Sequence, residues 1–246
     1  MLFTLQKASF APNVHWAFED PRTGYWIIVM DYIDGKALMD IWGHLSDIKK
    51  HDISHRIATI TRTMQEKTSS IIGPAGSHPS LAFAHRNRVP PLAMNGDTFT
   101  DHINGLVYHY NNDPLRVGNR ASYVRWQNGN NFVLSHMQIE PSNIILDKNN
   151  KVWLVGWGKG GFFPPECEIA MTYHLYFDTE KCPLIVGALM YYLDSCRPTV
   201  SALRAVIGFV EKAPAPVRHY LTRENVEDRT RHASEVVTYL LWGSHF

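Results

Sequence analysis

One segment of the 246-residue chain constrains its fold more than any other. Residues 132–170 read FVLSHMQIEPSNIILDKNNKVWLVGWGKGGFFPPECEIA. Within it, the apolar runs 144–146 and 152–155 flank the polar sequence DKNN at 147–150. Apolar, β-branched runs on either side of a short Asn- and Asp-containing turn are typical of a β-hairpin. The segment therefore predicts a polar loop at 136–143 that leads directly into a hairpin.

The loop and hairpin resemble the catalytic core of the aminoglycoside phosphotransferase and choline kinase-like family, in particular its fungal branch. Members read His-Gly-Asp-Leu-x-Pro-x-Asn-Ile-Leu and, after a turn, Ile-Ile-Asp-Trp-Glu. The matching residues here are His136, Pro141, Asn143 and Trp157. Residues 161–165 (GFFPP) resemble the family's Gly-Trp-Tyr-Pro-Glu, and residues 25–35 (YWIIVMDYIDG) resemble its fifth strand and hinge.

The resemblance extends from about residue 12 to residue 170 and is weaker beyond. It implies an α+β, protein kinase-like (aminoglycoside phosphotransferase-like) fold with a truncated β-rich N-lobe and a mainly helical C-lobe. Residues 1–35 would form the residual N-lobe and hinge. Residues 36–246 would form the helical C-lobe with the β-hairpin at its centre.

Two positions where the family carries catalytic carboxylates hold other residues. Gln138 stands where the family's Asp accepts the substrate hydroxyl proton, and Gly156 stands where a second Asp holds Mg²⁺. An amide oxygen has negligible basicity near neutral pH, and glycine offers nothing to an ion that prefers hard oxygen ligands. Since phosphoryl transfer depends on positioning and charge neutralisation, each loss should remove several kcal/mol of transition-state stabilisation.

The family's phosphate-covering loop, strand Lys and partner Glu have no counterpart ahead of the hinge strand, and Lys7 lies outside a matching strand context. We therefore expect no ATP-dependent phosphotransfer and no cofactor. We also expect no metal, because Asn143 alone provides too few ligands for an ion. Glu140 is a candidate substitute base. At this variable position of the family, we favour a solvent-facing loop residue instead.

Composition narrows the classes of partner. The net charge is +1 without a basic tract, which argues against nucleic acid as a partner. Three cysteines without metal-ligand spacing favour a reducing compartment. The longest apolar run, 184–193, is about half the length that spans a bilayer, and no signal peptide is visible. We expect a cytoplasmic protein with no membrane partner.

Periodicity places further elements. Strands are predicted at 14–18 and 25–33, joined by a turn at 20–24, and an amphipathic helix at 47–66 follows from the spacing of its apolar residues. Residues 73–97, rich in Gly, Pro, Ser and Asn, predict a long loop. Helices are predicted at 100–110, 114–127 and 232–242, and apolar stretches lie at 184–193 and 200–210.

Histidines and aromatic residues complete the candidate site. His51 and His55 share a helix face without a zinc signature, so a solvated face is expected. In the family the His136 position mainly orients the loop by hydrogen bonds, and we favour that role here. Gln138 is the predicted catalytic residue. The cleft or ligand-binding residues are predicted to be His136, Glu140, Asn143, Gly156, Trp157, Tyr32, Phe162 and Phe163.

Three functions fit these observations. The first is a non-phosphorylating catalyst of secondary metabolism, a cyclase or isomerase for an apolar natural-product intermediate. Its reaction could be pericyclic, such as a Diels-Alder reaction, with the Gln138 amide donating a hydrogen bond to a substrate carbonyl. The second is a pseudokinase-like scaffold with a protein partner, which predicts a contiguous exposed apolar patch. The third is a cryptic small-molecule phosphotransferase.

Overall fold

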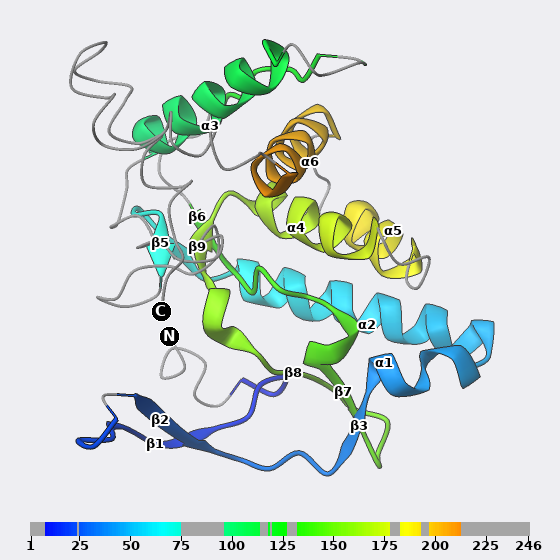
Figure 1. Ribbon diagram of the computed structural model, residues 1–246. Coiled ribbons are helices and arrows are strands. Elements are labelled where there is room, and N and C mark those ends of the chain that lie inside the picture. The colour runs from blue at the N-terminus through cyan, green and yellow to red at the C-terminus, as the bar shows by residue number, and fades with distance from the viewer. Residues whose placement is uncertain are drawn as a thin grey trace.

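The computed structural model describes residues 8–23, 25–74, 96–113, 118, 120–126, 132–177, 183–192 and 197–212. A small β-rich part at the N-terminal end is followed by a helical part (Figure 1), which confirms the predicted α+β class. This is the layout that the resemblance implied.

The N-terminal hairpin consists of β1 (Val14–Glu19) and β2 (Trp26–Met30), an antiparallel pair in which Phe18 lies opposite Ile27 and Ala17 opposite Ile28. It confirms the two predicted strands, although the second ends at Met30 rather than at residue 33. At the base of the hairpin the Asp31 carboxylate accepts hydrogen bonds from the Asn13 N–H (3.0 Å), Asn13 Nδ2 (2.7 Å) and His15 Nε2 (2.7 Å). These bonds tie β1 to the end of β2.

The predicted hairpin of residues 144–155 is also present. β7 (Ile144–Asp147) and β8 (Val152–Leu154) form an antiparallel sheet with β3 (Gly35–Ala37), in the order β3-β7-β8. The Asp147 carboxylate holds the turn, because it accepts from the Asn149 N–H (2.8 Å), the Lys151 N–H (2.9 Å) and Trp153 Nε1 (2.9 Å). Asn, which tolerates the left-handed region, occupies position 150 with a φ of 61°.

A third sheet brings the two flanks of the candidate loop together. Its strands are β4 (Thr68–Ser69), β6 (Phe132–Ser135), β9 (Gly161–Phe163) and β5 (Gly73–Pro74), in the order β4-β6-β9-β5. Because Ser135 lies opposite Gly161, the chain enters the loop 136–143 beside the point where it begins β9. The sheet therefore closes the segment 132–163 on itself.

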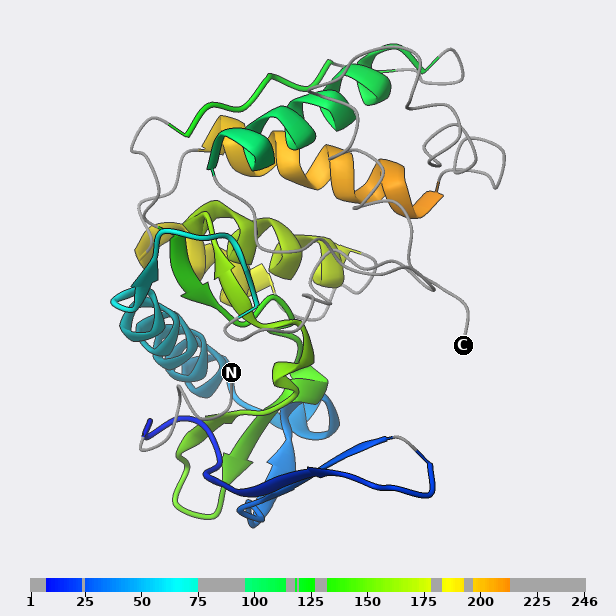
Figure 2. The same cartoon turned by 90° about the vertical axis from the view of Figure 1, so that its left-hand side faces the viewer.

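Six α-helices lie in the described part of the chain, namely α1 (Leu38–Ile41), α2 (Asp47–Gln65), α3 (Gly96–Asn111), α4 (Pro165–Phe177), α5 (Pro183–Tyr192) and α6 (Arg197–Lys212). Three 3₁₀ turns, η2 (Trp42–His44), η3 (Pro141–Asn143) and η4 (Trp157–Lys159), join other elements. Helix α2 packs on α5, and α6 packs on both α3 and α4 (Figures 1 and 2). The predicted helices 47–66 and 100–110 correspond to α2 and α3.

One predicted helix is wrong and others cannot be compared. Residues 120–126, within the predicted helix 114–127, carry no helix. The Asn104 and Asn111 side chains of α3 hold this segment, because each amide bonds both the N–H and the C=O of one residue, Val124 and Ala121 respectively. The predicted helix 232–242 and most of the loop 73–97 lie outside the described residues.

Candidate functional site

His136 begins the candidate loop as a buried, neutral side chain. Its Nε2–H donates to the Val155 carbonyl oxygen at 2.9 Å, and its ring meets that of Trp157 edge-on with centroids 4.4 Å apart. Burial lowers the pKa of His136 to about 4, although the carbonyl oxygens of Val155 and Gln138 partly oppose that shift. These contacts agree with a residue that orients the loop.

Met137 gives the loop its sharp bend. Its φ of 62° places a non-glycine residue in the left-handed region, which costs roughly 1–2 kcal/mol. A carboxylate from α4 compensates, since Glu168 accepts the backbone N–H of Met137 at 3.0 Å and also that of His136. Glu168 is fully buried, and burial raises the pKa of its carboxyl to about 7 against the lowering effect of those two N–H groups. Sequence reasoning did not single out this residue.

Gln138, Glu140 and Asn143 form one hydrogen-bonded cluster, which we call the amide cluster. Gln138 Nε2 donates to Glu140 Oε1 at 2.9 Å, and Asn143 Nδ2 donates to the same oxygen at 3.2 Å. Asn143 Nδ2 also lies 3.1 Å from the Gln138 carbonyl oxygen. Glu140 is half-buried and bonded to both amides, so the expected solvent-facing role is wrong. Its carboxylate instead fixes the direction of the Gln138 amide.

Gly156 lies against the amide cluster. It adopts the left-handed conformation (φ 78°, ψ 40°) just before η4, and a Cβ built on it would lie 2.5 Å from Asn143 Oδ1. That separation is far shorter than a normal contact, so any side chain at position 156 requires Asn143 to move. Asn143 thus occupies the space in which the family's metal-binding Asp side chain would begin.

The remaining predicted cleft residues have different surroundings. Trp157 is buried and donates its Nε1–H to the Leu154 carbonyl oxygen at 2.9 Å, while Phe163 is part of the hydrophobic core. Phe162 is half-buried on β9, opposite Leu134 of β6. Tyr32 is 87% exposed, beyond the end of β2. The structure therefore gathers His136, Gln138, Glu140, Asn143, Gly156 and Trp157 but gives Phe163 and Tyr32 other surroundings.

No group of three or more His, Cys, Asp or Glu side chains in the described part of the chain is arranged to hold a metal ion. No helix in the same residues is long and apolar enough to cross a membrane.

Comparisons with known proteins identify a solved structure of similar fold. No protein family profile matches the chain, and no curated protein matches its sequence. The solved structure of the aminoglycoside phosphotransferase APH(2'')-IIa in complex with gentamicin is similar to it with a TM-score of 0.48 and 15% sequence identity. The superposition covers 98% of this chain and 79% of that one. Membership of the family remains a prediction from the residues of segment 132–170.

Proposed function

We propose that the protein is a non-phosphorylating, small-molecule catalyst, a cyclase or isomerase that acts on an apolar intermediate with a conjugated carbonyl group. The observation that carries this proposal is the hydrogen bond from Gln138 Nε2 to Glu140 Oε1. Because a carboxylate only accepts, the bond fixes which end of the amide faces Glu140. An amide with a fixed direction is a suitable donor for a substrate carbonyl.

The Gln138 side-chain amide has a second N–H that could bind a ligand. Its NH₂ group carries two hydrogens, one of which Glu140 takes, and the second has no partner among the described residues. Donation of that hydrogen to an unsaturated carbonyl would withdraw electron density from the adjoining double bond. A pericyclic ring closure would then need no proton transfer. Its barrier would fall mainly because the substrate is held in a reactive shape, an effect worth several kcal/mol.

The amide cluster gives less support to phosphoryl transfer. Glu140, the one carboxylate in it, is engaged by two amide N–H groups, and Asn143 lies where a metal-binding side chain would start at Gly156. Glu140 is therefore proposed to position Gln138 rather than to serve as a base. No cofactor is part of the proposed reaction.

A thermal-shift comparison tests the proposal. Hydrophobic α,β-unsaturated carbonyl compounds should raise the melting temperature, while ATP with Mg²⁺ should not. The Gln138→Leu variant keeps the size of the side chain but has no donor, so it should lose the response. Asn149→Ala, an exposed residue of the β7–β8 turn, serves as the control and should keep it. Stabilisation by ATP with Mg²⁺ at modest concentration, unchanged in Gln138→Leu, would overturn the proposal.

A second candidate function is a scaffold or interaction protein. The observation that favours it is the set of exposed apolar side chains on the β1–β2 hairpin, including Trp16, Phe18 and Ile28. Under this proposal a stoichiometric protein partner co-purifies with the chain, and Trp16→Ser weakens the complex while Gln138→Leu leaves it unchanged. The opposite pattern would favour the catalyst.

A further inference from the structure

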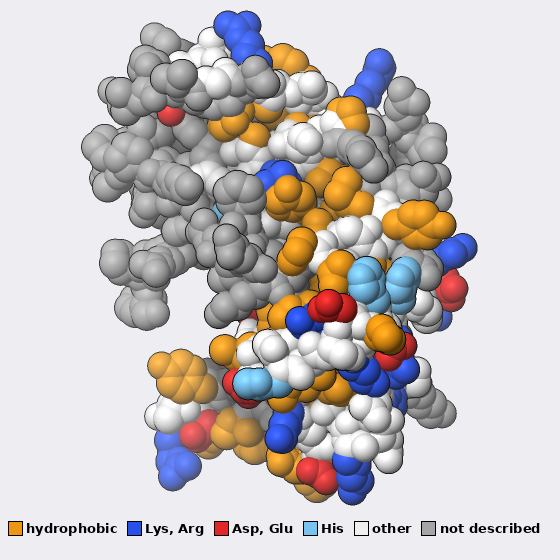
Figure 3. Space-filling model, turned by 90° about the vertical axis from the view of Figure 1, so that its right-hand side faces the viewer, with side chains coloured by type: hydrophobic (Ala, Val, Ile, Leu, Met, Phe, Trp, Pro, Cys, Tyr) orange, Lys and Arg blue, Asp and Glu red, His pale blue; other side chains and the backbone are white. Residues whose placement is uncertain are grey.

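Glu168 differs from the acidic side chains at the surface. Figure 3 shows acidic side chains beside Lys and Arg on one face of the molecule, and Asp34 and Lys148 form an exposed pair of this kind. Glu168 is fully buried instead, and its carboxylate accepts the backbone N–H groups of His136 and Met137. These two partners belong to the candidate loop, although Glu168 itself is on α4.

Only an ionised carboxylate serves both N–H groups of the loop. Glu168 Oε1 accepts from Met137 at 3.0 Å, and Oε2 accepts from His136. A protonated carboxyl carries an O–H donor on one of its oxygens. One N–H of the loop then faces a donor, and a buried N–H without an acceptor is costly. Because His136 is also anchored by its ring bond to Val155, the bond from Met137 is the one that is lost more easily.

Met137 is the residue of the loop that depends most on this bond. Its φ of 62° costs roughly 1–2 kcal/mol for a residue with a side chain. Such a conformation persists only while its surroundings hold it. Helix α4 is fixed by its packing on α5 and α6. Loss of the bond would therefore move the loop rather than the helix, and Gln138 is the next residue in the chain.

We infer that Glu168 is a positioning residue, which aims the Gln138 amide only while its carboxyl is ionised. With Glu168 ionised, Met137 keeps its bend and the bond from Gln138 Nε2 to Glu140 Oε1 is made at 2.9 Å. With Glu168 protonated, Met137 leaves the left-handed region and Gln138 turns away from Glu140. The site then binds its ligand at mildly alkaline pH and loses it at acidic pH. The inference rests on the proposed function for ligand binding by Gln138, but not for the movement of the loop.

The surroundings of the carboxyl set the pH range. Burial raises the pKa of Glu168 to about 7, and the N–H groups of His136 and Met137 lower it by less. Both forms of Glu168 are therefore populated near neutral pH. His136 faces it from the loop, and burial lowers the pKa of that imidazole to about 4, so it stays neutral across this range. Cys167 stays a thiol, because burial raises its pKa well above the usual value.

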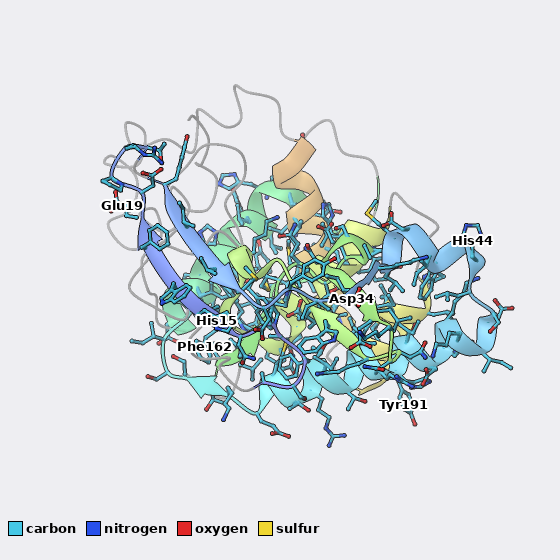
Figure 4. All side chains as sticks on the ribbon, turned by 90° about the horizontal axis from the view of Figure 1, so that it is seen from below. His15, Glu19, Asp34, His44, Phe162 and Tyr191 are labelled. Atoms are coloured by element: carbon cyan, nitrogen blue, oxygen red, sulfur yellow. The ribbon has the colours of Figure 1, made fainter. Side chains whose placement is uncertain are left out.

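The other titratable or charged groups on α4 and its neighbouring helices have different positions or partners. Glu166 accepts a hydrogen bond from an indole N–H at 3.2 Å, and His174 lies in the last turn of α4. Arg204 of α6 lies over the Tyr173 ring, 3.2 Å from its centroid. Tyr191 of α5 is 82% exposed and lies at the edge of the molecule (Figure 4). A transition of the loop near pH 7 is therefore assigned to the buried carboxyl.

Nuclear magnetic resonance tests the movement of the loop without a ligand. In the parent chain, the Met137 backbone amide and the Gln138 side-chain amide should shift together as the pH is raised, with one midpoint near pH 7. Glu168→Gln cannot ionise, so both signals should stay near the positions that the parent shows at acidic pH. Glu166→Gln changes the neighbouring carboxyl in the first turn of α4, and this control should titrate like the parent.

Ligand affinity gives the functional readout. The probe is trans-chalcone, an apolar unsaturated ketone without a titrating group, and quenching of tryptophan fluorescence measures its binding. The parent should bind it roughly 30-fold more tightly at pH 8.5 than at pH 5.5, because the ionised fraction of Glu168 changes by that factor. Glu168→Gln should bind weakly and equally at both pH values, and Gln138→Leu should bind at neither. Glu166→Gln should keep the pH dependence of the parent.

The inference and the proposed function fail in different ways. A loop transition near pH 7 without chalcone binding at any pH supports the role of Glu168 and counts against the proposed catalyst. Amide signals that do not shift near pH 7, or that shift equally in Glu168→Gln, overturn the inference even if chalcone binds. If Glu168→Gln fails to fold, the carboxyl carbon signal of Glu168 in the parent provides the test. Its midpoint must coincide with those of Met137 and Gln138, and different midpoints overturn the inference.

Discussion

The β1–β2 hairpin and the candidate loop 136–143 differ in the contacts that stabilise them. In the loop, a left-handed residue, a buried histidine and two side-chain amides each have a specific partner. These partners come from α4, from Val155 just after β8, and from the loop itself. In the hairpin, large apolar side chains lie in water, and a single Asp31 cluster secures the base. The loop is thus held in one geometry by specific bonds, while the apolar side chains of the hairpin remain exposed.

The strongest test of this contrast is the removal of the carboxylate that holds the loop. Glu168→Ala leaves the backbone N–H groups of His136 and Met137 buried without an acceptor. We expect a loss of about 3–5 kcal/mol in the free energy of unfolding, measured by urea denaturation. Glu66→Ala, an exposed residue just after α2, should change it by less than about 0.5 kcal/mol. A small effect of Glu168→Ala would show that the loop is not held by this carboxylate.

A second test restores the carboxylate that the family carries. Gly156→Asp should destabilise the fold by about 2 kcal/mol, because an L-residue at φ 78° is strained and its Cβ meets Asn143 Oδ1. In a double-mutant cycle, Asn143→Ala should recover part of the loss, since it removes the atom in the way. Additive effects of the two substitutions would contradict the proposed steric conflict.

The pH dependence of stability distinguishes two buried titratable groups, His136 of the loop and Glu168 of α4, which holds the loop. The pKa of His136 is lowered from 6.5 to about 4, so the stability linked to it is present above pH 6.5 and is lost as the pH falls toward 4. The pKa of Glu168 is raised from 4.5 to about 7, so its contribution is full below pH 4.5 and is lost as the pH rises toward 7. Between pH 4.5 and 6.5, His136 therefore makes the free energy of unfolding rise with pH, while Glu168 makes it fall.

Glu168→Gln removes the contribution of Glu168, so the pH dependence of the free energy of unfolding that remains should be that of His136. In this variant we expect the free energy of unfolding to rise with pH between 4.5 and 6.5 by about 1 kcal/mol per pH unit more than in the parent chain. Denaturant titrations at several pH values provide the measurement. Parallel pH profiles of the variant and the parent would contradict the shift assigned to Glu168.

The smallest effect is expected in the hairpin. Asp31→Asn weakens the hydrogen bonds from Asn13 and His15 and removes the negative charge that they stabilise. Those bonds, first the one from the Asn13 backbone N–H and then the one from the His15 ring, hold the pKa of the Asp31 carboxyl below its usual value. Amide hydrogens of β1 and β2 should then exchange severalfold faster, while those of α2 keep their rates. Uniform acceleration across the protein would show that the hairpin unfolds only with the rest of the chain.

Sequence reasoning succeeded where the interacting residues are close along the chain. The hairpin 144–154 was predictable because its turn chemistry is local to Asp147 and Asn150. The contact between Gln138 and Glu140 is local too, although its hydrogen bond was not foreseen. Glu168 escaped notice because it lies 31 residues from Met137, and the one available signal was an acidic residue in an otherwise apolar run, CEIAM.

The incorrect helix prediction has a physical cause. Residues 120–126 have a composition compatible with a helix, but Asn104 and Asn111 of α3 hydrogen-bond to their backbone groups. Such tertiary contacts are not encoded in local pattern. Tyr32 is 87% exposed, and its place in the cleft stays a prediction.

The close approach of Gly156 and Asn143 also bears on how a new ligand could be introduced at this position. A Cβ at position 156 would lie 2.5 Å from Asn143 Oδ1, so a carboxylate placed there meets its neighbour before it meets an ion. Engineering a metal ligand at position 156 therefore depends on the order of substitutions, with residue 143 changed before residue 156.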